Sequence, residues 1–337
     1  MRIAQVATIS APVLAESTGS VESLVWLLAR ELQTLGHDVT VFGTRNSKVP
    51  GKLESVLPGP YGSPGSLNDW HVCEYLNLAH AVSKAGDFDI LHTHAYLWGV
   101  PLECLCSSKM VHTMHIVPDD DAARLWALHP GAAVTALSQH QWSGHPELKP
   151  VAVIPHGLDP GEFEFSATPD DYVVYLGRFV SGKGARHAIR YARELGLRLL
   201  LAGPENAWFR EHIKPDVDGK NVEYIGYVSG AQKIKLLGRA RALLYPIQFP
   251  ESFGLVLIES MLCGTPVVAM GIGAAPEIVE QGVTGFCVAD SDEFLRAIPN
   301  AFALPRNTIR ATAERRFSAQ RMAQGYLKVY QQLTGKT

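Results

Sequence analysis

The chain has 337 residues, a length typical of two domains, and 47% of them are hydrophobic, which can supply two cores. A formal net charge of −3 argues against a protein that holds nucleic acid by neutralising its phosphates. No uninterrupted apolar stretch reaches about 18 residues, so we expect no membrane span and a cytoplasmic location. The five cysteines lack zinc-ligand spacing, which favours buried, reduced thiols.

The first half of the chain alternates short apolar segments with helical patterns. Its opening, MRIAQVATISAPV, superficially resembles a signal peptide, but an amphipathic helix follows at once, which favours the first strand of a sheet. The predicted strands of this half are 2–8, 38–43, 89–93, 110–114, 133–137 and 151–154, and the first predicted helix is 21–35. This alternation predicts a parallel sheet with crossover helices.

A small polar loop, Thr18-Gly19-Ser20, precedes the first predicted helix. Amides at a helix N-terminus bind anions, and a glycine lets a ligand approach the backbone closely, so the loop is a candidate phosphate site. A plain turn with a serine N-cap remains the alternative.

Two histidines stand two residues apart at the end of the third predicted strand. His92 and His94 would share one face of that strand and could bind a metal. No third histidine or carboxylate nearby in the sequence completes such a site, so a polar pocket wall is the simpler interpretation.

A second series of alternating elements follows a linker predicted at 156–171, where His-Gly, Asp-Pro-Gly and Thr-Pro-Asp-Asp break any regular pattern. Its predicted strands are 172–176, 197–202, 222–224, 242–245, 266–269 and 285–288. The last predicted helix, 318–333, carries an apolar face made of Met322, Tyr326, Val329, Tyr330 and Leu333. A second parallel sheet is therefore expected.

The segment YVVYLGRFVSGKGARHAIRYARELG places two cations in one loop. It predicts a strand at 172–176, a loop at 177–184 and a helix at 186–195, which puts Arg178 and Lys183 at the carboxyl edge of the sheet. A guanidinium fork and an ammonium suit a diphosphate at that edge. Two solvated loop cations are the alternative.

The segment PESFGLVLIESMLCGTPVVA places two acids around a helix start. The pattern predicts a helix at 255–262 with a C-terminal Gly264, so Glu251 precedes the helix and Glu259 lies inside it. Acids flanking free helix amides can frame a polyhydroxylated ligand whose phosphates sit on the helix N-terminus. A surface acid and an ordinary helix glutamate are the alternative.

With these two segments, the sequence resembles glycosyltransferase family 4, the retaining nucleotide-sugar transferases of the GT-B fold. The resemblance covers nearly the whole chain, through GHDVTVF, DILHTH, VHTMH, VIPHGLD, LGRFVSGKG, the segment 250–270 and EIVEQGVTGF. It implies two Rossmann-like domains facing a cleft. An acceptor domain would span 1–160 and a nucleotide-sugar domain 161–317, with a terminal helix, 318–337, packing back on the first.

The resemblance also implies roles in the second domain. Arg178 and Lys183 would offset the charge of the leaving diphosphate. Backbone amides at the start of the helix would assist them, namely those around Phe253, Gly254 and Leu255. Glu251 would bind hydroxyls of the donor sugar, and Glu259 would bind those of the ribose.

In the first domain, His115 matches the position where the family places a histidine facing the reacting sugar, whereas a lone histidine is otherwise usually structural. Asp119, with His94, is a candidate for the acceptor site, although acids also favour a solvated helix start. The family commonly has two glycines where this chain has Gly19 and Ser20, which leaves close backbone approach at Ser20 in question.

The activity implied is retaining transfer of a hexose from a nucleoside-diphosphate sugar, UDP-glucose being the common donor, to a small-molecule, lipid-linked or glycan acceptor. No DxD-type metal motif is evident, so neither metal nor cofactor is expected. We expect a monomer or homodimer, no nucleic-acid partner and at most peripheral membrane contact. The alternatives are a nucleotide-sugar hydrolase or epimerase of the same fold and a non-catalytic sugar-nucleotide-binding subunit.

Overall fold

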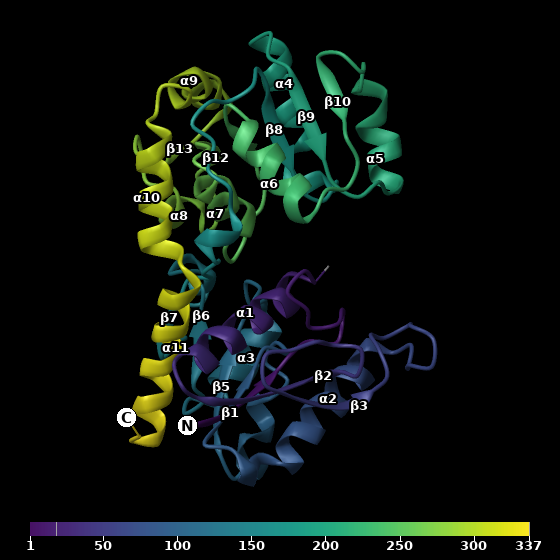
Figure 1. Ribbon diagram of the computed structural model, residues 1–337, viewed down its shortest axis with the longest axis vertical. Coiled ribbons are helices and arrows are strands. Elements are labelled where there is room, and N and C mark those ends of the chain that lie inside the picture. Colours follow the sequence, from purple (N-terminus) through teal and green to yellow (C-terminus); the bar gives the residue numbers. More distant parts are fainter. Residues whose placement is uncertain (18, 337) are drawn as a thin grey trace. The chain divides into compact units, whose positions relative to one another are not determined.

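The computed structural model describes residues 1–17 and 19–336, so Thr18 of the predicted phosphate loop lies outside the described residues. The chain forms two compact units. Unit 1 combines Met1–Leu158 with Ala319–Thr337, and unit 2 is Asp159–Ser318. Each unit contains one parallel sheet with covering helices (Figure 1), which confirms the predicted fold class.

Unit 1 contains a seven-stranded sheet in the order β3-β2-β1-β4-β5-β6-β7. The strands are β1 (Arg2–Val6), β2 (Asp38–Thr44), β3 (Lys52–Leu57), β4 (Ile90–Thr93), β5 (Lys109–Thr113), β6 (Val134–Ala136) and β7 (Ala152–Val153). The α-helices are α1 (Ser20–Thr34), α2 (Trp70–Ser83), α3 (Asp120–Ala127) and α11 (Ala319–Thr334). Three short 3-10 turns, Ala85–Asp87, Val100–Leu105 and His140–Trp142, complete it.

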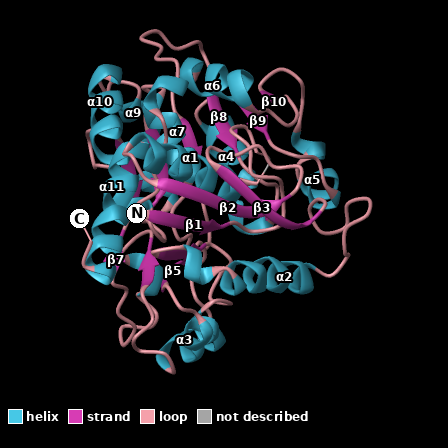
Figure 2. Cartoon of the chain, turned by 60° about the horizontal axis from the view of Figure 1, so that its bottom comes forward, coloured by secondary structure: helices cyan, strands magenta, loops and turns pink. Residues whose placement is uncertain are grey.

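Both faces of this sheet are buried, so the central strands are covered on both sides and bury even their polar residues, among them Gln5 of β1 and His92 and Thr93 of β4. Along β1, Ile3 packs with α1 and α11, and the next residue, Ala4, packs with α2 on the opposite face (Figure 2). The face of α11 predicted from its spacing is the buried one, with Met322, Tyr326 and Tyr330 at most 3% exposed. The end of the chain thus completes the core of unit 1.

One strand, β3, was absent from the predicted series. It pairs only with β2 at the edge of the sheet, and most of its side chains are half-buried or exposed. Its sequence, KLESVL, therefore shows neither the apolar run of a central strand nor a regular alternation. Edge strands often carry such polar residues.

Unit 2 contains a six-stranded sheet in the order β10-β9-β8-β11-β12-β13. The strands are β8 (Val173–Leu176), β9 (Leu199–Ala202), β10 (Val222–Tyr224), β11 (Leu243–Tyr245), β12 (Val267–Met270) and β13 (Gly285–Val288). The α-helices are α4 (Ala185–Glu194), α5 (Ala207–His212), α6 (Gly230–Arg239), α7 (Leu255–Leu262), α8 (Ala275–Ile278), α9 (Ser291–Ala301) and α10 (Arg306–Phe317). Its 3-10 turns are Pro160–Glu162, Ser181–Lys183 and Lys214–Asp216.

The strand order fixes where each unit can bind a ligand. In an open parallel sheet, the loops leave in opposite directions where the strand order reverses, and ligands bind there at the carboxyl ends of the strands. That point lies between β1 and β4 in unit 1 and between β8 and β11 in unit 2. No helix among residues 1–17 and 19–336 is long and apolar enough to cross a bilayer.

Candidate functional site

The loops that follow β8 and β11 in unit 2 pack closely against each other and share a backbone hydrogen bond. The loop after β8 ends at Gly184, which has φ +80° and whose hypothetical Cβ would lie 1.9 Å from the carbonyl oxygen of Pro246. Only glycine accepts both that conformation and that contact. In the same place, the amide of Gln248 donates to the carbonyl of Gly182 at 2.8 Å.

This packing brings a predicted cation and a predicted acid into contact. The Lys183 ammonium donates to one carboxylate oxygen of Glu251, and the Tyr245 hydroxyl donates to the other. The side chains of Lys183 and Glu251 are only 14% and 21% exposed, and the ammonium lies 5.4 Å from the centre of the Phe249 ring. A diphosphate arriving here would compete with Glu251 for this ammonium.

The second predicted cation, Arg178, is exposed two residues after the end of β8. Its carbonyl accepts a hydrogen bond from the Tyr175 hydroxyl at 3.1 Å, which ties the loop to the strand. The structure therefore places Arg178 at the predicted edge, with its side chain toward solvent.

The helix start after β11 also lies where the sequence predicts it. Gly254 is the N-cap residue of α7, and Leu255 is its first residue. The Phe253 side chain is buried and contacts Phe317, with ring centres 6.1 Å apart. Because α7 follows β11, its N-terminal amides lie at the carboxyl edge of the sheet, and a helix N-terminus favours negative charge.

Glu259 has a partner that the sequence did not predict. Lys233 of α6 donates to its carboxylate at 2.6 Å, and the Glu259 side chain is 13% exposed. A ribose bound by Glu259 would have to share the carboxylate with this lysine. Lys233 was missed because no local pattern marks a cation 26 residues away.

In unit 1, the loop between β1 and α1 is held by a buried carboxylate. Glu22 accepts hydrogen bonds from the amides of Ser10 and Ala11 at 3.1 and 3.0 Å. A Cβ on Gly19 would lie 2.0 Å from the other carboxylate oxygen of Glu22, so a larger residue at position 19 would displace the Glu22 side chain. Phosphate binding by Gly19 remains a prediction.

Four histidines lie close together at the carboxyl ends of β4 and β5. His94 Nδ1 lies 3.1 Å from His115 Nε2, and the His115 ring stacks on His156 with centres 5.3 Å apart. Burial lowers the pKa of His115 to about 4 and holds those of His92, His94 and His156 well below their usual value. All four rings are therefore neutral near pH 7.

The His92 ring belongs to the core. Its Nδ1 lies 2.7 Å from the Tyr330 hydroxyl and its Nε2 lies 2.7 Å from Thr113 Oγ1. Within residues 1–17 and 19–336, no group of three histidine, cysteine or acidic side chains is arranged to hold a metal ion. On the other face of β5, His112 Nε2 contacts Glu103 at 2.8 Å.

Asp119, the acceptor-site candidate, caps a helix. Its carboxylate accepts from the amide of Ala122 at 2.9 Å, at the start of α3. This arrangement fits the alternative interpretation of a helix start, and a contact with an acceptor remains a prediction.

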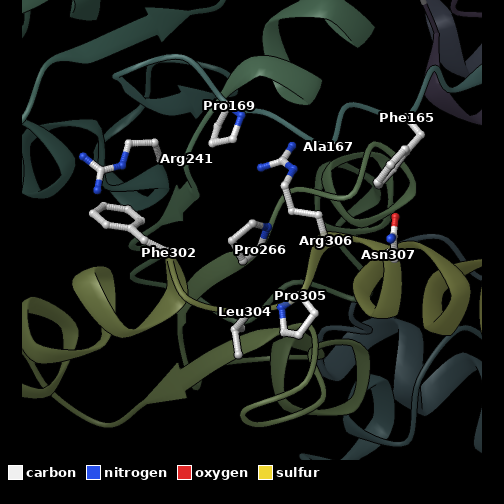
Figure 3. A pocket seen from close by; sticks show the side chains of 10 residues that line it. All are labelled: Phe165, Ala167, Pro169, Arg241, Pro266, Phe302, Leu304, Pro305, Arg306 and Asn307. Atoms are coloured by element: carbon white, nitrogen blue, oxygen red, sulfur yellow. The ribbon is translucent and has the colours of Figure 1, made fainter.

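A separate hollow of about 430 Å³ lies at the opposite, amino-terminal edge of the sheet of unit 2 (Figure 3). Arg241 and Pro266, which line it, precede β11 and β12. The Arg306 guanidinium in its wall donates to three carbonyls and to the Thr265 hydroxyl, so it holds segments of the fold together. The hollow is therefore distinct from the diphosphate site predicted around Lys183.

Two family models match the chain. Residues 162–316 match glycosyl transferases group 1, and residues 21–162 match glycosyltransferase family 4. The chain belongs to the family 4 glycosyltransferases. The D-inositol 3-phosphate glycosyltransferase of Acidothermus cellulolyticus is 26% identical to it, over 86% of this chain and 80% of the relative. The glycogen synthase of Mycobacterium tuberculosis is 30% identical over 44% of this chain and 38% of the relative.

Solved structures agree with this assignment. AviGT4, a glycosyltransferase involved in avilamycin A biosynthesis, is 26% identical, with a TM-score of 0.75 over 100% of this glycosyltransferase and 99% of that chain. The sucrose-phosphate synthase of Thermosynechococcus elongatus has a TM-score of 0.80 over 99% of both chains, and HepE of Anabaena has 0.75 over 99% and 100%. At 20% and 19% identity, these two show the shared GT-B fold.

Proposed function

We propose that this glycosyltransferase moves a hexose from a nucleoside-diphosphate sugar to an acceptor hydroxyl, with retention of anomeric configuration and without a metal ion. The observation that carries the proposal is the contact of Lys183 with Glu251 beside the N-terminus of α7, at the point of unit 2 where parallel sheets bind ligands. A cation, a guanidinium on the same loop and helix amides together can stabilise a leaving diphosphate.

In the first proposed step, Lys183 changes its ion-pair partner. The diphosphate of the donor replaces Glu251 at the Lys183 ammonium. Glu251, still held by the Tyr245 hydroxyl, then accepts hydrogen bonds from the donor sugar. As the bond from the anomeric carbon to the diphosphate lengthens, its electrons move onto the phosphate oxygen, where Lys183, Arg178 and the α7 amides offset the charge.

In this proposal, the acceptor hydroxyl attacks from the side that the diphosphate leaves and gives its proton to the leaving phosphate oxygen. Retention follows from attack on that side. The neutral ring of His115 binds a hydroxyl of the reacting sugar.

UDP-glucose is the donor that we propose to test first. HepE, which shares the fold, is described in complex with UDP-glucose. The acceptors of relatives differ, since inositol 3-phosphate glycosyltransferases and a glycogen synthase are both among them. Inositol 3-phosphate and glycogen, for which these relatives are named, are both polyhydroxylated, so we propose a polyhydroxylated acceptor.

Substitutions of the two glutamates should have different effects on UDP affinity, measured by calorimetric titration. We expect Glu259→Gln to weaken UDP binding about tenfold or more, because a hydrogen bond to a charged group contributes about 1.5–3 kcal/mol. Glu251→Gln should leave UDP affinity unchanged or raise it, because Lys183 loses its competing anion. The Glu251→Gln variant should instead turn over the complete donor more slowly, because Glu251 is assigned to the donor sugar.

Glu194→Gln is the matched control, since Glu194 is an exposed helix acid at the end of α4. It should change neither quantity. Equal losses of UDP affinity in the Glu251 and Glu259 variants would contradict the assignment of sugar to one acid and ribose to the other.

A further inference from the structure

Two buried polar side chains of α2 attach this helix to the end of β1. Glu74 Oε1 accepts a hydrogen bond from the amide of Ile9 at 2.8 Å. Asn77 Nδ2 donates to the carbonyls of Ala7 and Phe42 at 3.0 and 3.3 Å. Glu74 and Asn77 are 5% and 1% exposed, and their spacing of three residues puts them on one face of the helix. They hold the segment that leads from β1 into the loop before α1, at the point of unit 1 where parallel sheets bind ligands.

The second oxygen of each of these side chains lacks a hydrogen-bond donor. In the part of the chain that the structure describes, Glu74 Oε2 and Asn77 Oδ1 are buried and have no partner. The orientation of the Asn77 amide is fixed, because both partners of its nitrogen are backbone carbonyls, which can only accept. The Thr8 hydroxyl is also buried and donates to neither oxygen. Two buried acceptors without a donor cost free energy, and a proton on Glu74 would remove that cost.

No cation among the described residues compensates a negative charge on Glu74. The ionic side chains on α2 and on the elements packed against it have partners of their own, in the pairs Arg2–Asp89, Lys52–Asp38 and His71–Asp69 and in the group of Glu54, His80 and Lys84. The other titratable groups on these elements bring no positive charge near pH 7, namely Cys73, Tyr75, Asp87 and the neutral His92. Burial raises the pKa of Glu74 to about 7, and the nearby anion Glu22 contributes to the rise.

We propose that Glu74 is a neutral carboxylic acid below pH 7, whose Oε2–H donates to Asn77 Oδ1, and that loss of this proton to solvent at higher pH loosens the attachment of α2 to the loop after β1. One proton between the two oxygens satisfies both of them. Without it, both oxygens are left without a donor. The loop contains Gly19, the candidate phosphate position, so this acid makes the site of unit 1 sensitive to pH.

The protonation of a carboxyl group can be read directly by ¹³C NMR of protein labelled with ¹³C-glutamate. The Glu74 signal is assigned through bonds to its own backbone amide, so the assignment needs no variant. We expect the Glu74 carboxyl carbon to titrate with a midpoint near pH 7. A midpoint below about 5, in the range of an ordinary glutamate, would overturn the proposal whatever reaction the enzyme catalyses.

Glu74→Gln reproduces the neutral acid, because its amide oxygen can accept from Ile9 and its NH₂ group can donate to Asn77. The folded wild type holds the Glu74 proton more tightly than the unfolded chain does, so its stability is lost as the pH rises from about 4.5 to about 7. We therefore expect the folding equilibrium constant of Glu74→Gln, relative to the wild type, to grow about 30-fold from pH 5.5 to pH 8.5. Urea unfolding followed by tryptophan fluorescence measures it, since five of the six tryptophans lie in unit 1.

The ratio of variant to wild type is the informative quantity, because the buried histidines act in the opposite direction. The lowered pKa values of His92, His94, His115 and His156 cost stability as the pH falls below about 6.5, equally in both proteins. A ratio that does not change with pH would overturn the proposal. So would a Glu74→Gln variant that fails to fold, since its amide should satisfy both partners.

Glu22→Gln is the matched comparison, because Glu22 is a second buried glutamate at the same loop. Its carboxylate accepts from the amides of Ser10 and Ala11 and from the Ser10 hydroxyl, so this variant should be less stable than the wild type at both pH values. A gain of stability at pH 8.5 in both glutamate variants would overturn the role of the unpartnered oxygen.

The effect on the site is measured by the pH profile of transfer, and this part rests on the proposed function. The turnover of the wild type, relative to that of Glu74→Gln, should fall several-fold from pH 6 to pH 8.5. A constant ratio would overturn the control of the site by Glu74. If the wild type turned over no donor at any pH, the proposed function would fail, while the NMR titration and the unfolding ratio would still decide the state of Glu74.

Discussion

Replacing Lys183 by alanine should lower the turnover of donor by about two to three orders of magnitude, because one donor to developing charge contributes about 2.7–4 kcal/mol in a transition state. Arg178→Ala should act in the same direction. The free energy of unfolding of Lys183→Ala should fall by only about 1–2 kcal/mol, since Glu251 keeps the hydrogen bond from Tyr245. Initial rates at saturating donor, together with urea unfolding, measure both effects.

The control for these two variants is Lys220→Ala, which removes an exposed cation in a turn of the same unit. Its turnover should match the wild type. Near-wild-type transfer by both Lys183→Ala and Arg178→Ala would remove the assignment of the diphosphate to this loop.

Gly184→Ala should be the most destabilising single-methyl change near the site. A non-glycine residue at φ +80° costs about 1–2 kcal/mol, and the new methyl group would lie 1.9 Å from a backbone oxygen, so one of the two packed loops must move. We expect the free energy of unfolding to fall by about 3 kcal/mol or more. Chemical denaturation measures it, and UDP titration should show a parallel loss of affinity.

Gly196→Ala provides the comparison. Gly196 also has a positive φ, +63°, but a methyl group there would meet nothing within 4 Å. Its cost should stay near the conformational 1–2 kcal/mol, with UDP affinity unchanged. Equal destabilisation in the two variants would mean that the contact with Pro246 contributes nothing.

Strands in the interior of each sheet could be predicted because both of their faces are buried. In the series that begins at residue 172, the predicted bounds of each strand lie within two residues of the observed bounds. Helix α7 was predicted at its observed bounds. The edge strand β3 was not predicted, because its sequence, KLESVL, has neither an apolar run nor a regular alternation. The edge strands β7, β10 and β13 were predicted, so a place at the edge does not by itself prevent the prediction of a strand.

Helix α2 shows a second limit of sequence patterns. It buries the polar residues Glu74 and Asn77 and exposes Trp70 and Tyr75. Glu74 accepts from the amide of Ile9 at 2.8 Å, and burial raises its pKa to about 7. An amphipathic pattern assumes that only apolar residues face the core, and α2 buries Glu74 and Asn77 beside Cys73, Leu78 and Ala81, so its pattern gives a weak signal.

The candidate site was predicted in its residue types but not in its partners. Sequence placed Lys183 and Glu251 in two separate motifs, and the fold brings them into contact. Lys233, Tyr245 and Gln5 were missed because each meets a predicted residue only through a tertiary contact, with Glu259, Glu251 and His94 respectively. A lysine, a tyrosine or a glutamine outside any motif carries no local mark of such a role.

Proton NMR of the sugar product tests the central claim most directly. The protein is incubated with UDP-glucose and a panel of polyhydroxylated acceptors in excess chelator, and the anomeric signal of the new glycoside is compared with that of the donor. We expect an α-linked product, as in the donor, at a rate that the chelator does not change. An inverted linkage, or activity that vanishes in chelator and returns with magnesium or manganese, would contradict a retaining, metal-independent transferase.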